Sequence, residues 1–485
     1  MSITVSGNKK GIAKALMILL LCFFMLIGSA GIMAPANAQT SSKSPFSNVG
    51  YSSYTHNSRF DGRLIVNGVD TSDWQSKKCD WTKAKEAGVD YAIMRVTWSA
   101  TAKGSLKTKN DSAFESNYKN AKAAGVMCGA YVFSQAKNAK EAVKEADFAV
   151  ARLRALGIGP NDLELPVYMD YEFSGTRLTG RLYGITKAKA TNAAAAFCNR
   201  IKAHGYTPGI YANLSFFKNQ LDTSKFASDV DLWCAQYYKK CESAVNYSKW
   251  QYSSSAKIDG LLSWMGIKGK IDVNFWYVNR NVNASPLTTI KGRTVLSLAD
   301  AAKPRFTIKN GSATLVEGVD YIVGGIRNNK KGNAYAYIKG IGSYGGYALV
   351  PITVTDSSSG EANANLNGIC ANYLTYANTE FSVCTEKIDD SVSYKKGGKY
   401  TVNTDLNIRK GASTAKAKVR RSSLSKKAKK ATSSGVYAVL KPGTKVKCVK
   451  VSGDWIKVKV KVGSKWAKVY GGWICTQDGD EVYVE

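Results

Sequence analysis

The chain has 485 residues, a formal net charge of +32 at pH 7 and only two histidines, His56 and His204. A charge of this size bears on association, and it favours anionic polymers as partners. His56 lies in a Ser/Asn-rich segment and His204 lies at the end of an expected helix, where a surface cap is the expected role. Zinc amidases and Cys-His peptidases need histidines at strand or helix tips, so these positions argue against both chemistries.

The first 38 residues have the pattern of a secretory signal peptide. Lys9, Lys10 and Lys14 precede an apolar run from residue 15 to about residue 32, which is followed by Ala36-Asn37-Ala38. A basic region, an apolar region and an A-x-A site predict cleavage after Ala38. The alternative is an uncleaved membrane anchor, because the run is near the length that spans a bilayer. We expect the mature chain to be secreted and not to associate with the membrane after cleavage. Residues 39–62 are expected to be a linker.

From residue 63 to residue 282, short apolar runs alternate with longer amphipathic ones. Several amphipathic runs stop at glycine, as in KEAGVD and KAHGYT, which is typical of a helix C-terminus. Repetition of strand and helix over some 220 residues predicts a parallel sheet closed into one barrel. The expected strands are 64–69, 91–96, 126–133, 165–169, 208–211, 232–237 and 271–275, and the expected helices are 81–87, 112–124, 139–156 and 187–204.

Two acids end the apolar stretch LPVYMDYEF at 165–173. Asp170 and Glu172 are two residues apart, so on a strand they share one face and stand roughly 7 Å apart. Two close carboxyl groups can divide into an acid and a base because their environments move the pKa values apart. This pair is the minimum equipment for glycoside hydrolysis. The alternative is a strand end that carries two solvated acids.

Further acids and aromatic residues fit the same end of a barrel. Asp70 ends the first expected strand and Asp272 opens the last one. In such barrels the working residues lie at the C-terminal ends of strands. Aromatic planes can stack on the C–H faces of sugar rings, although each aromatic alone is also compatible with core packing. Around four acids, the set predicts a saccharide cleft, with these candidate substrate-binding residues: Tyr131, Tyr211, Tyr237 and Trp250.

Six segments in order resemble glycoside hydrolase family 25, the Chalaropsis-type lysozymes: GVDTSDWQ at 68–75, MDYEF at 169–173, GIYAN at 209–213, LWCAQY at 232–237, WQYSS at 250–254 and IDVNFW at 271–276. The resemblance covers residues 63–282. It implies an irregular β/α barrel that cleaves the β-1,4 bond between N-acetylmuramic acid and N-acetylglucosamine in peptidoglycan. We expect no metal or other cofactor.

By position in these motifs, the resemblance assigns roles to the four acids. Glu172 resembles the family's general acid, which protonates the leaving oxygen. Asp170 resembles its partner carboxylate, which orients the 2-acetamido group or stabilises developing positive charge. Asp70 and Asp272 match the other two acids of the cleft. The competing hypothesis is a non-catalytic wall glycan-binding protein, which needs no protonatable acid at residue 172.

After residue 282 the helical pattern gives way to short alternating strands with Asn-Gly and Glu-Gly turns. Residues 283–355 are expected to form a small β-sandwich, and they resemble the immunoglobulin-like modules of Gram-positive surface proteins. The module could be a passive spacer or a ligand-binding unit. Residues 356–394 are rich in Ser, Asn and Ala and are expected to form a linker. We expect Cys370 to pair with Cys384, and Cys448 with Cys475.

Residues 395–485 hold 22 Lys and Arg against 6 Asp and Glu, a net charge of +16. The segments LNIRKGAS, PGTKVKCV and the Trp-containing strands resemble a bacterial Src-homology-3-like wall-binding domain. A basic insertion at 411–435 is either a solvated, disordered tract or an anchor to anionic wall polymer. We expect a monomeric, wall-associated protein whose partners are peptidoglycan and anionic wall polymers. Nucleic acid is not expected, because the basic segment lacks a recognised nucleic-acid fold motif.

Overall fold

The structure is a computed structural model that describes residues 40–75, 77–177, 179–263, 265–279, 286–325, 330–376, 384, 394–402, 404–478 and 481–484. The expected signal peptide lies outside these residues. Among the helices in the described part of the chain, none is both long enough and apolar enough to cross a membrane.

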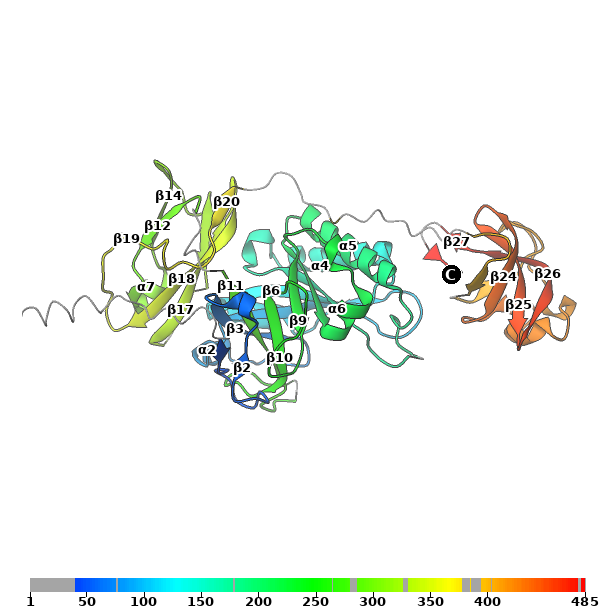
Figure 1. Cartoon of the computed structure of the whole chain (residues 1–485), viewed down its shortest axis with the longest axis horizontal. Helices are drawn as coiled ribbons and strands as arrows, with labels where there is room; N and C mark the ends of the chain where they lie inside the picture. The colour runs from blue at the N-terminus through cyan, green and yellow to red at the C-terminus, as the bar shows by residue number, and fades with distance from the viewer. Residues whose placement is uncertain are drawn as a thin grey trace, which may run out of the picture.

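Eight strands close into a barrel at the centre of Figure 1. Around the barrel the order is β3-β11-β10-β9-β8-β7-β6-β4, and β4 pairs with β3 to close the ring. A short strand, β5 (Thr108–Asn110), extends the sheet beside β4. The strands are β3 (Leu64–Thr71), β4 (Tyr91–Ser99), β6 (Met127–Ser134), β7 (Val167–Tyr171), β8 (Pro208–Asn213), β9 (Asp231–Ala235), β10 (Lys249–Ala256) and β11 (Ile271–Val278). The seven expected strands are confirmed, and β10 was not predicted as a strand.

One strand of the barrel runs against the others. All neighbouring barrel strands are parallel except β11, which pairs antiparallel with both β10 and β3. The first residues of β11 therefore lie beside the last residues of β3, and Asp272 is directly opposite Asp70. This reversal explains how an acid that opens its strand reaches the same rim as acids that end theirs.

The helices cover the outside of the barrel between its first strands. They are α2 (Trp81–Glu86), α3 (Phe114–Ala123), α4 (Ala139–Ala155), α5 (Lys187–Ala203) and α6 (Leu214–Gln220). Asp80, Asn138 and Thr186 cap α2, α4 and α5 by accepting a backbone N–H. After α3 and α5 the chain turns at Gly125 and Gly205, whose φ angles of 76° and 86° suit glycine. The four predicted helices are confirmed, and α6 was not predicted.

Residues 40–62, expected to be a linker, are packed on the barrel. β1 (Ser41–Ser42) pairs with β2 (Tyr54–Thr55), and Phe60 stacks on Tyr277 of β11 with ring centroids 3.8 Å apart. His56 is buried, and its Nδ1 is 2.8 Å from the hydroxyl oxygen of Tyr277. Burial lowers the pKa of His56 to about 4. Sequence reasoning missed this N-terminal strap because its apolar residues are isolated among polar ones.

The next module is built of two small sheets around one core. The first sheet has the order β15-β14-β12-β19, and the second has β13-β18-β17-β16 with β20 beside β18. Because Leu366, Cys370 and Leu374 are buried in this core, the first part of the expected linker folds with the module. Its elements are β12 (Thr289–Gly292), β13 (Val295–Ser297), α7 (Leu298–Ala302), β14 (Phe306–Asn310), β15 (Ala313–Thr314), β16 (Tyr321–Gly324), β17 (Gly332–Gly340), β18 (Tyr344–Thr355), β19 (Ala364–Asn365) and β20 (Leu374–Tyr376).

This middle module, residues 286–376, packs against the end of the barrel where the parallel strands begin. Tyr347 of the module lies 5.6 Å from Trp276 of β11, measured between ring centroids. The Tyr337 hydroxyl donates to the backbone oxygen of Glu164, and Lys339 Nζ donates to that of Leu163 at 3.0 Å. Tyr337 and Leu349 share one hydrophobic cluster with barrel residues. The module therefore closes this end of the barrel.

Neither expected cysteine pair forms in the structure, because Cys370, Cys384 and Cys448 are not in disulfides. Cys370 lies in the core of the middle module, whereas Cys384 lies in the barrel core. The Cys384 backbone N–H donates to Asn199 Oδ1 of α5 at 3.0 Å. Cys448 and Cys475 lie on β24 and β26, which are separated by β25.

Residues 394–484, where described, form a C-terminal β domain. Its main sheet has the order β21-β24-β25-β26. The basic insertion is folded, because Val419, Leu424 and Ala428 are buried in the domain core. A disordered insertion is therefore wrong. The elements are β21 (Lys399–Thr401), β22 (Leu406–Asn407), η4 (Arg421–Ser423), η5 (Ala428–Ala431), β23 (Val439–Leu440), β24 (Lys445–Ser452), β25 (Trp455–Val462), β26 (Lys465–Cys475), β27 (Gln477–Asp478) and β28 (Glu481–Val482).

Candidate active site

A cleft of about 820 Å³ lies at the end of the barrel opposite the middle module. All four predicted acids line it: Asp70 from β3, Asp170 from β7, Glu172 from the turn after β7, and Asp272 from β11. The strand ends thus bring together residues that are up to 202 positions apart in the chain.

The cleft raises the pKa of every one of these acids. Burial raises the pKa of Asp70 to about 6 and that of Glu172 to about 7. Burial also raises the pKa values of Asp170 and Asp272 well above their usual range, and charge on the neighbouring acids adds to the effect. Since four carboxylates in one cleft repel each other, the group holds protons near neutral pH. A protonated carboxyl group is therefore available as a proton donor near neutral pH, where water contains few free protons.

Asp70 is fixed by two amide side chains. Gln251 Nε2 and Asn274 Nδ2 donate to Asp70 Oδ2 at 2.9 and 2.8 Å. Trp233 Nε1 in turn donates to Asn274 Oδ1 at 2.8 Å, which fixes the orientation of that amide. Both donors favour the ionised form of Asp70, so they oppose part of the rise in its pKa caused by burial.

Asp170 and Glu172 have different surroundings. Asp170 is buried, and its Oδ1 atom has no hydrogen-bond partner among the described residues. The positive charge of Arg95 lowers the pKa of Asp170 but does not offset its burial. Glu172 receives a hydrogen bond from the Asn213 side chain, which favours its charged form. Asn213 Oδ1 also accepts the Phe216 N–H as the N-cap of α6, so the amide group is held by both contacts.

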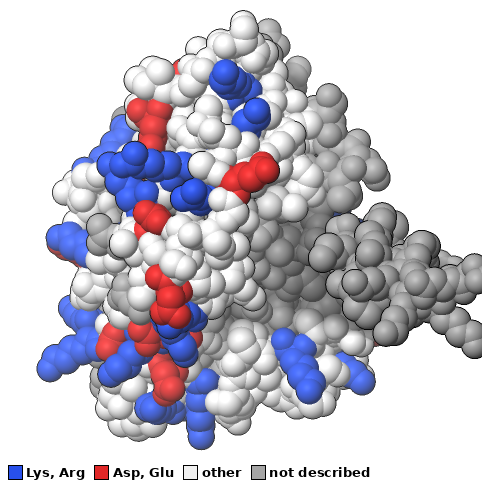
Figure 2. Space-filling model, turned by 90° about the vertical axis from the view of Figure 1, so that its left-hand side faces the viewer, with Lys and Arg blue, Asp and Glu red and all other residues white. Residues whose placement is uncertain are grey.

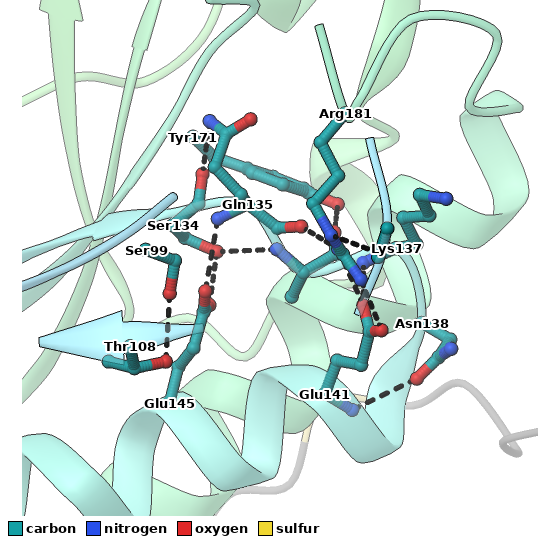
Figure 3. Close-up of polar contacts among 12 residues, drawn as sticks. Ser99, Thr108, Ser134, Gln135, Lys137, Asn138, Glu141, Glu145, Tyr171 and Arg181 are labelled. Carbon is teal, nitrogen blue, oxygen red and sulfur yellow. Dashed lines mark hydrogen bonds and ion pairs between the residues drawn. The ribbon is translucent and has the colours of Figure 1, made fainter. Parts of the chain in front are cut away.

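A polar network around Gln135 holds the chain beside Glu172, and Figure 3 shows the part of it that Gln135 forms with Glu145, Arg181 and Glu141. Gln135 Nε2 donates to the backbone oxygen of Glu172 at 3.3 Å, and the Gln135 backbone N–H donates to Glu145 at 3.0 Å. Arg181 donates to the Gln135 backbone oxygen and forms an ion pair with Glu141. Burial raises the pKa of Glu145 to about 7. This network connects β6, α4 and the loop after β7, and thereby positions Glu172.

Of the four aromatic residues predicted to bind substrate, three line the cleft and one does not. Tyr131, Tyr211 and Tyr237 line the cleft. Tyr237 is 53% exposed, whereas Tyr211 is buried and its hydroxyl donates to Gln251 Oε1 at 2.8 Å. Trp250 is a wrong prediction. It has no exposed surface and packs edge-on against Tyr54 of the N-terminal strap. On β10, Gln251 faces the cleft, so its neighbour Trp250 must point outward.

Several cleft residues were not predicted. Arg95, Gln251 and Trp98 line it. Behind the lining, Asn274 donates to Asp70 and the Asn213 side chain bonds to Glu172. A signal existed for Asn274, which is two residues after Asp272 and so shares its face of the strand. Exposed apolar side chains also border the cleft, with Trp74 and Met265 both 63% exposed.

Residues 69–261 match the family described as Glycosyl hydrolases family 25. Lysozyme M1 of Streptomyces globisporus is 25% identical over 215 residues, which are 43% of this chain and 67% of that protein. The autolysin LytC from Streptococcus pneumoniae, solved in complex with a synthetic peptidoglycan ligand, is 22% identical with a TM-score of 0.37. That match covers 44% of this chain and 47% of the autolysin, so the chain spans about half the length of that protein.

A family 25 glycosyl hydrolase from Bacillus anthracis is 19% identical, with a TM-score of 0.36, over 45% of this chain and 91% of that one. The family match and the acid-lined cleft together define a glycoside hydrolase. The match to the model of glycosyl hydrolase family 25 covers β3 to β10 and the helices between them, so the similarity lies in the barrel.

Proposed function

We propose that the protein is a secreted lysozyme that hydrolyses the β-1,4 bond between N-acetylmuramic acid and N-acetylglucosamine in peptidoglycan. The observation that carries the proposal is the position of Glu172, a carboxyl group with a pKa raised to about 7, among three further acids in one cleft. A general acid works best when its pKa lies near the operating pH.

In this mechanism protonated Glu172 donates its proton to the glycosidic oxygen as the bond from that oxygen to the sugar carbon breaks. Positive charge then develops on the sugar ring. That charge favours ionisation of Asp170, which releases its proton to solvent, and the resulting carboxylate stabilises the charge or orients the 2-acetamido group. A water molecule then bonds through its oxygen to the sugar carbon, and the proton it loses restores the carboxyl group of Glu172. Asp70, with its oxygen Oδ2 occupied by two amide donors, keeps a fixed orientation during the step.

The remaining parts of the chain give the proposal its cellular setting. The signal pattern in residues 1–38 supports export. The motifs and small antiparallel sheet of the C-terminal β domain support a Src-homology-3-like domain that holds the enzyme on the wall. We expect a monomer that needs no cofactor, with peptidoglycan as its substrate.

The test is digestion of purified peptidoglycan by residues 39–485 and by the variant Glu172→Gln. Released ends are reduced with borohydride and identified by mass spectrometry. We expect the parent chain to release reducing muramic acid ends and Glu172→Gln to release almost none, while both still sediment with the wall. Glu86→Gln, an exposed change on α2 outside the cleft, is the matched control and should retain activity.

Two outcomes would overturn parts of the proposal. Reducing glucosamine ends would keep a hydrolase but change the bond that is cut. If neither chain released fragments and both bound the wall, the barrel would be a glycan-binding module.

A further inference from the structure

The C-terminal β domain carries four lysines in a row across its main sheet. Lys399 lies opposite Lys447, Lys447 opposite Lys459, and Lys459 opposite Lys468. Directly opposed residues of antiparallel strands project from the same face. These four residues, the lysine row, therefore cross all four strands on one face. With strands about 4.8 Å apart, the row is about 14 Å long.

The other face of the same strands is the domain core. Val446 is opposite Val460, which is opposite Ala467, and all three are buried. The alternation of lysine and valine along β25 thus separates a charged face from an apolar one. More lysines share the charged face, because they are two positions from members of the row or opposite one another: Lys445, Lys450, Lys457 and Lys461.

The lysine row opposes folding. Like charges that lie directly opposite each other destabilise a sheet. Within the described part of this domain, no ion pair joins a lysine of the row to a carboxylate. Lysines often protect exposed sheet edges from pairing with other chains. This explanation does not cover Lys447 and Lys459, which lie on the two central strands. Neither stability nor edge protection accounts for the row.

The contrast with the middle module supports a role in binding. The side of the molecule at the left of Figure 1, where this module lies, shows positive and negative side chains interspersed (Figure 2). Residues 286–376 hold 9 Lys and Arg against 5 Asp and Glu, whereas residues 395–485 hold 22 against 6. Residues 395–485 therefore carry +16 of the chain's net charge of +32, four times the +4 of the middle module.

We infer that the lysine row binds a linear polymer of the bacterial envelope that carries repeated phosphodiester groups. A lysine ammonium is a compact point charge that binds phosphate oxygens without the planar geometry that arginine requires. Four such charges in line suit a string of anions better than a single one. Nucleic acid offers the same chemistry, and the choice of an envelope polymer rests on the proposed wall-cleaving function.

The test compares two triple variants in the full chain from residue 39, each carrying Glu172→Gln so that binding is measured without hydrolysis. The first changes Lys447, Lys459 and Lys468 to Gln. The second, the control for net charge, changes Lys416, Lys426 and Lys427 to Gln; these lysines are exposed in the insertion, which is the competing candidate for the anchor to wall polymer. Both lose three charges. The insertion packs on the core face through Ala428, so its neighbours Lys426 and Lys427 lie away from the row.

Binding is measured to purified Gram-positive walls, to the same walls after hydrofluoric acid has removed their phosphodiester polymers, and to single-stranded DNA. We expect tight binding to untreated walls, with the row variant about 100-fold weaker at low salt and the control less than about threefold weaker. Removing the polymers should abolish the difference between the variants. Circular dichroism should show both variants folded, with the row variant melting no lower than its parent, because cross-strand repulsion is relieved.

Three results would overturn the inference. An equal loss in both variants would mean that net charge alone attracts the wall. Equal binding to treated and untreated walls would assign the domain to peptidoglycan. Equal or tighter binding to DNA would make nucleic acid the ligand. Hydrolysis of treated walls by chains with Glu172 intact is measured separately. The proposed lysozyme function can therefore fail while the binding result stands, and the reverse.

Discussion

The two ends of the barrel treat buried charge in opposite ways. At the closed end, buried Lys249 donates to Asp231 Oδ2 at 3.1 Å, and the Ser248 and Tyr168 hydroxyls donate to Asp231 Oδ1. At the open end, Asp170 is buried with one oxygen unpartnered and three more acids nearby. At the closed end, where the contacts only stabilise the barrel, the carboxylate has a cation as its partner. At the open end, where a proton can be transferred, the buried carboxyl groups lie mainly beside other acids. Removing a charge should therefore have opposite effects on stability at the two ends.

Asp170→Asn should give the largest effect. We expect peptidoglycan hydrolysis to fall by about 10³-fold, within the range that acid-base groups contribute. The melting temperature should rise, because a neutral side chain of the same shape removes repulsion from the cleft. Reducing-end release and thermal unfolding of the same preparation check both parts. Activity within tenfold of the parent chain, or a lower melting temperature, would contradict this interpretation of the open end.

Asp231→Asn is the same change at the closed end, and its effects should be reversed. Lys249 would keep its buried charge without a carboxylate partner, so we expect the free energy of unfolding to fall by about 3 kcal/mol. Hydrolysis per folded molecule should stay within about twofold of the parent. Denaturant unfolding and activity at low temperature measure the two quantities. An unchanged unfolding midpoint would show that the closed end does not depend on this ion pair.

Glu145→Gln should change how stability depends on pH. The pKa of Glu145 is raised from 4.5 to about 7, so above pH 4.5 the unfolded chain releases this proton while the folded chain keeps it. The stability of the parent therefore falls as pH rises from about 4.5 to about 7, by roughly 3 kcal/mol from this group. The difference in unfolding free energy between parent and variant should change across this range and be constant above it. A difference that does not vary with pH would contradict the raised pKa.

Asn213→Ser should produce the smallest change, in the pH dependence of hydrolysis. The Asn213 side chain favours ionised Glu172, and serine keeps the α6 N-cap but is too short to reach that carboxyl group. The pKa of Glu172 should then rise above about 7, and the alkaline loss of activity should move to higher pH. The pH profile of kcat/KM measures this shift. A shift to lower pH would remove Asn213 as the group that sets this pKa.

The sequence predicted the open end of the barrel better than the closed end. Asp70, Asp170, Glu172 and Asp272 could be found because each adjoins an apolar strand, and a parallel barrel brings strand ends to one rim. Their partners Gln251 and Asn274 lie inside the quoted motifs but have no feature that marks them before the strand register is known. Alternation along β10 decides that Gln251 enters the cleft and Trp250 leaves it.

The packing of the N-terminal strap and of the middle module on the barrel could not be predicted from the sequence. His56, Phe60 and Tyr347 are buried by partners that lie far from them in the sequence. The local hydrophobic periodicity does not indicate such contacts. Because their neighbours are polar, residues 40–62 and 356–376 were predicted to be linkers. Tertiary packing decided these segments.

The contact of Cys384 with α5 limits the freedom of the C-terminal domain. The backbone is held there by Asn199, and the next described residue is Tyr394. Ten peptide units can span at most about 36 Å, so the domain begins within about one domain diameter of the barrel wall. A polymer that the domain binds is then presented to the cleft at an effective concentration in the millimolar range. The tether would let one binding event support many cuts in the same neighbourhood of the wall.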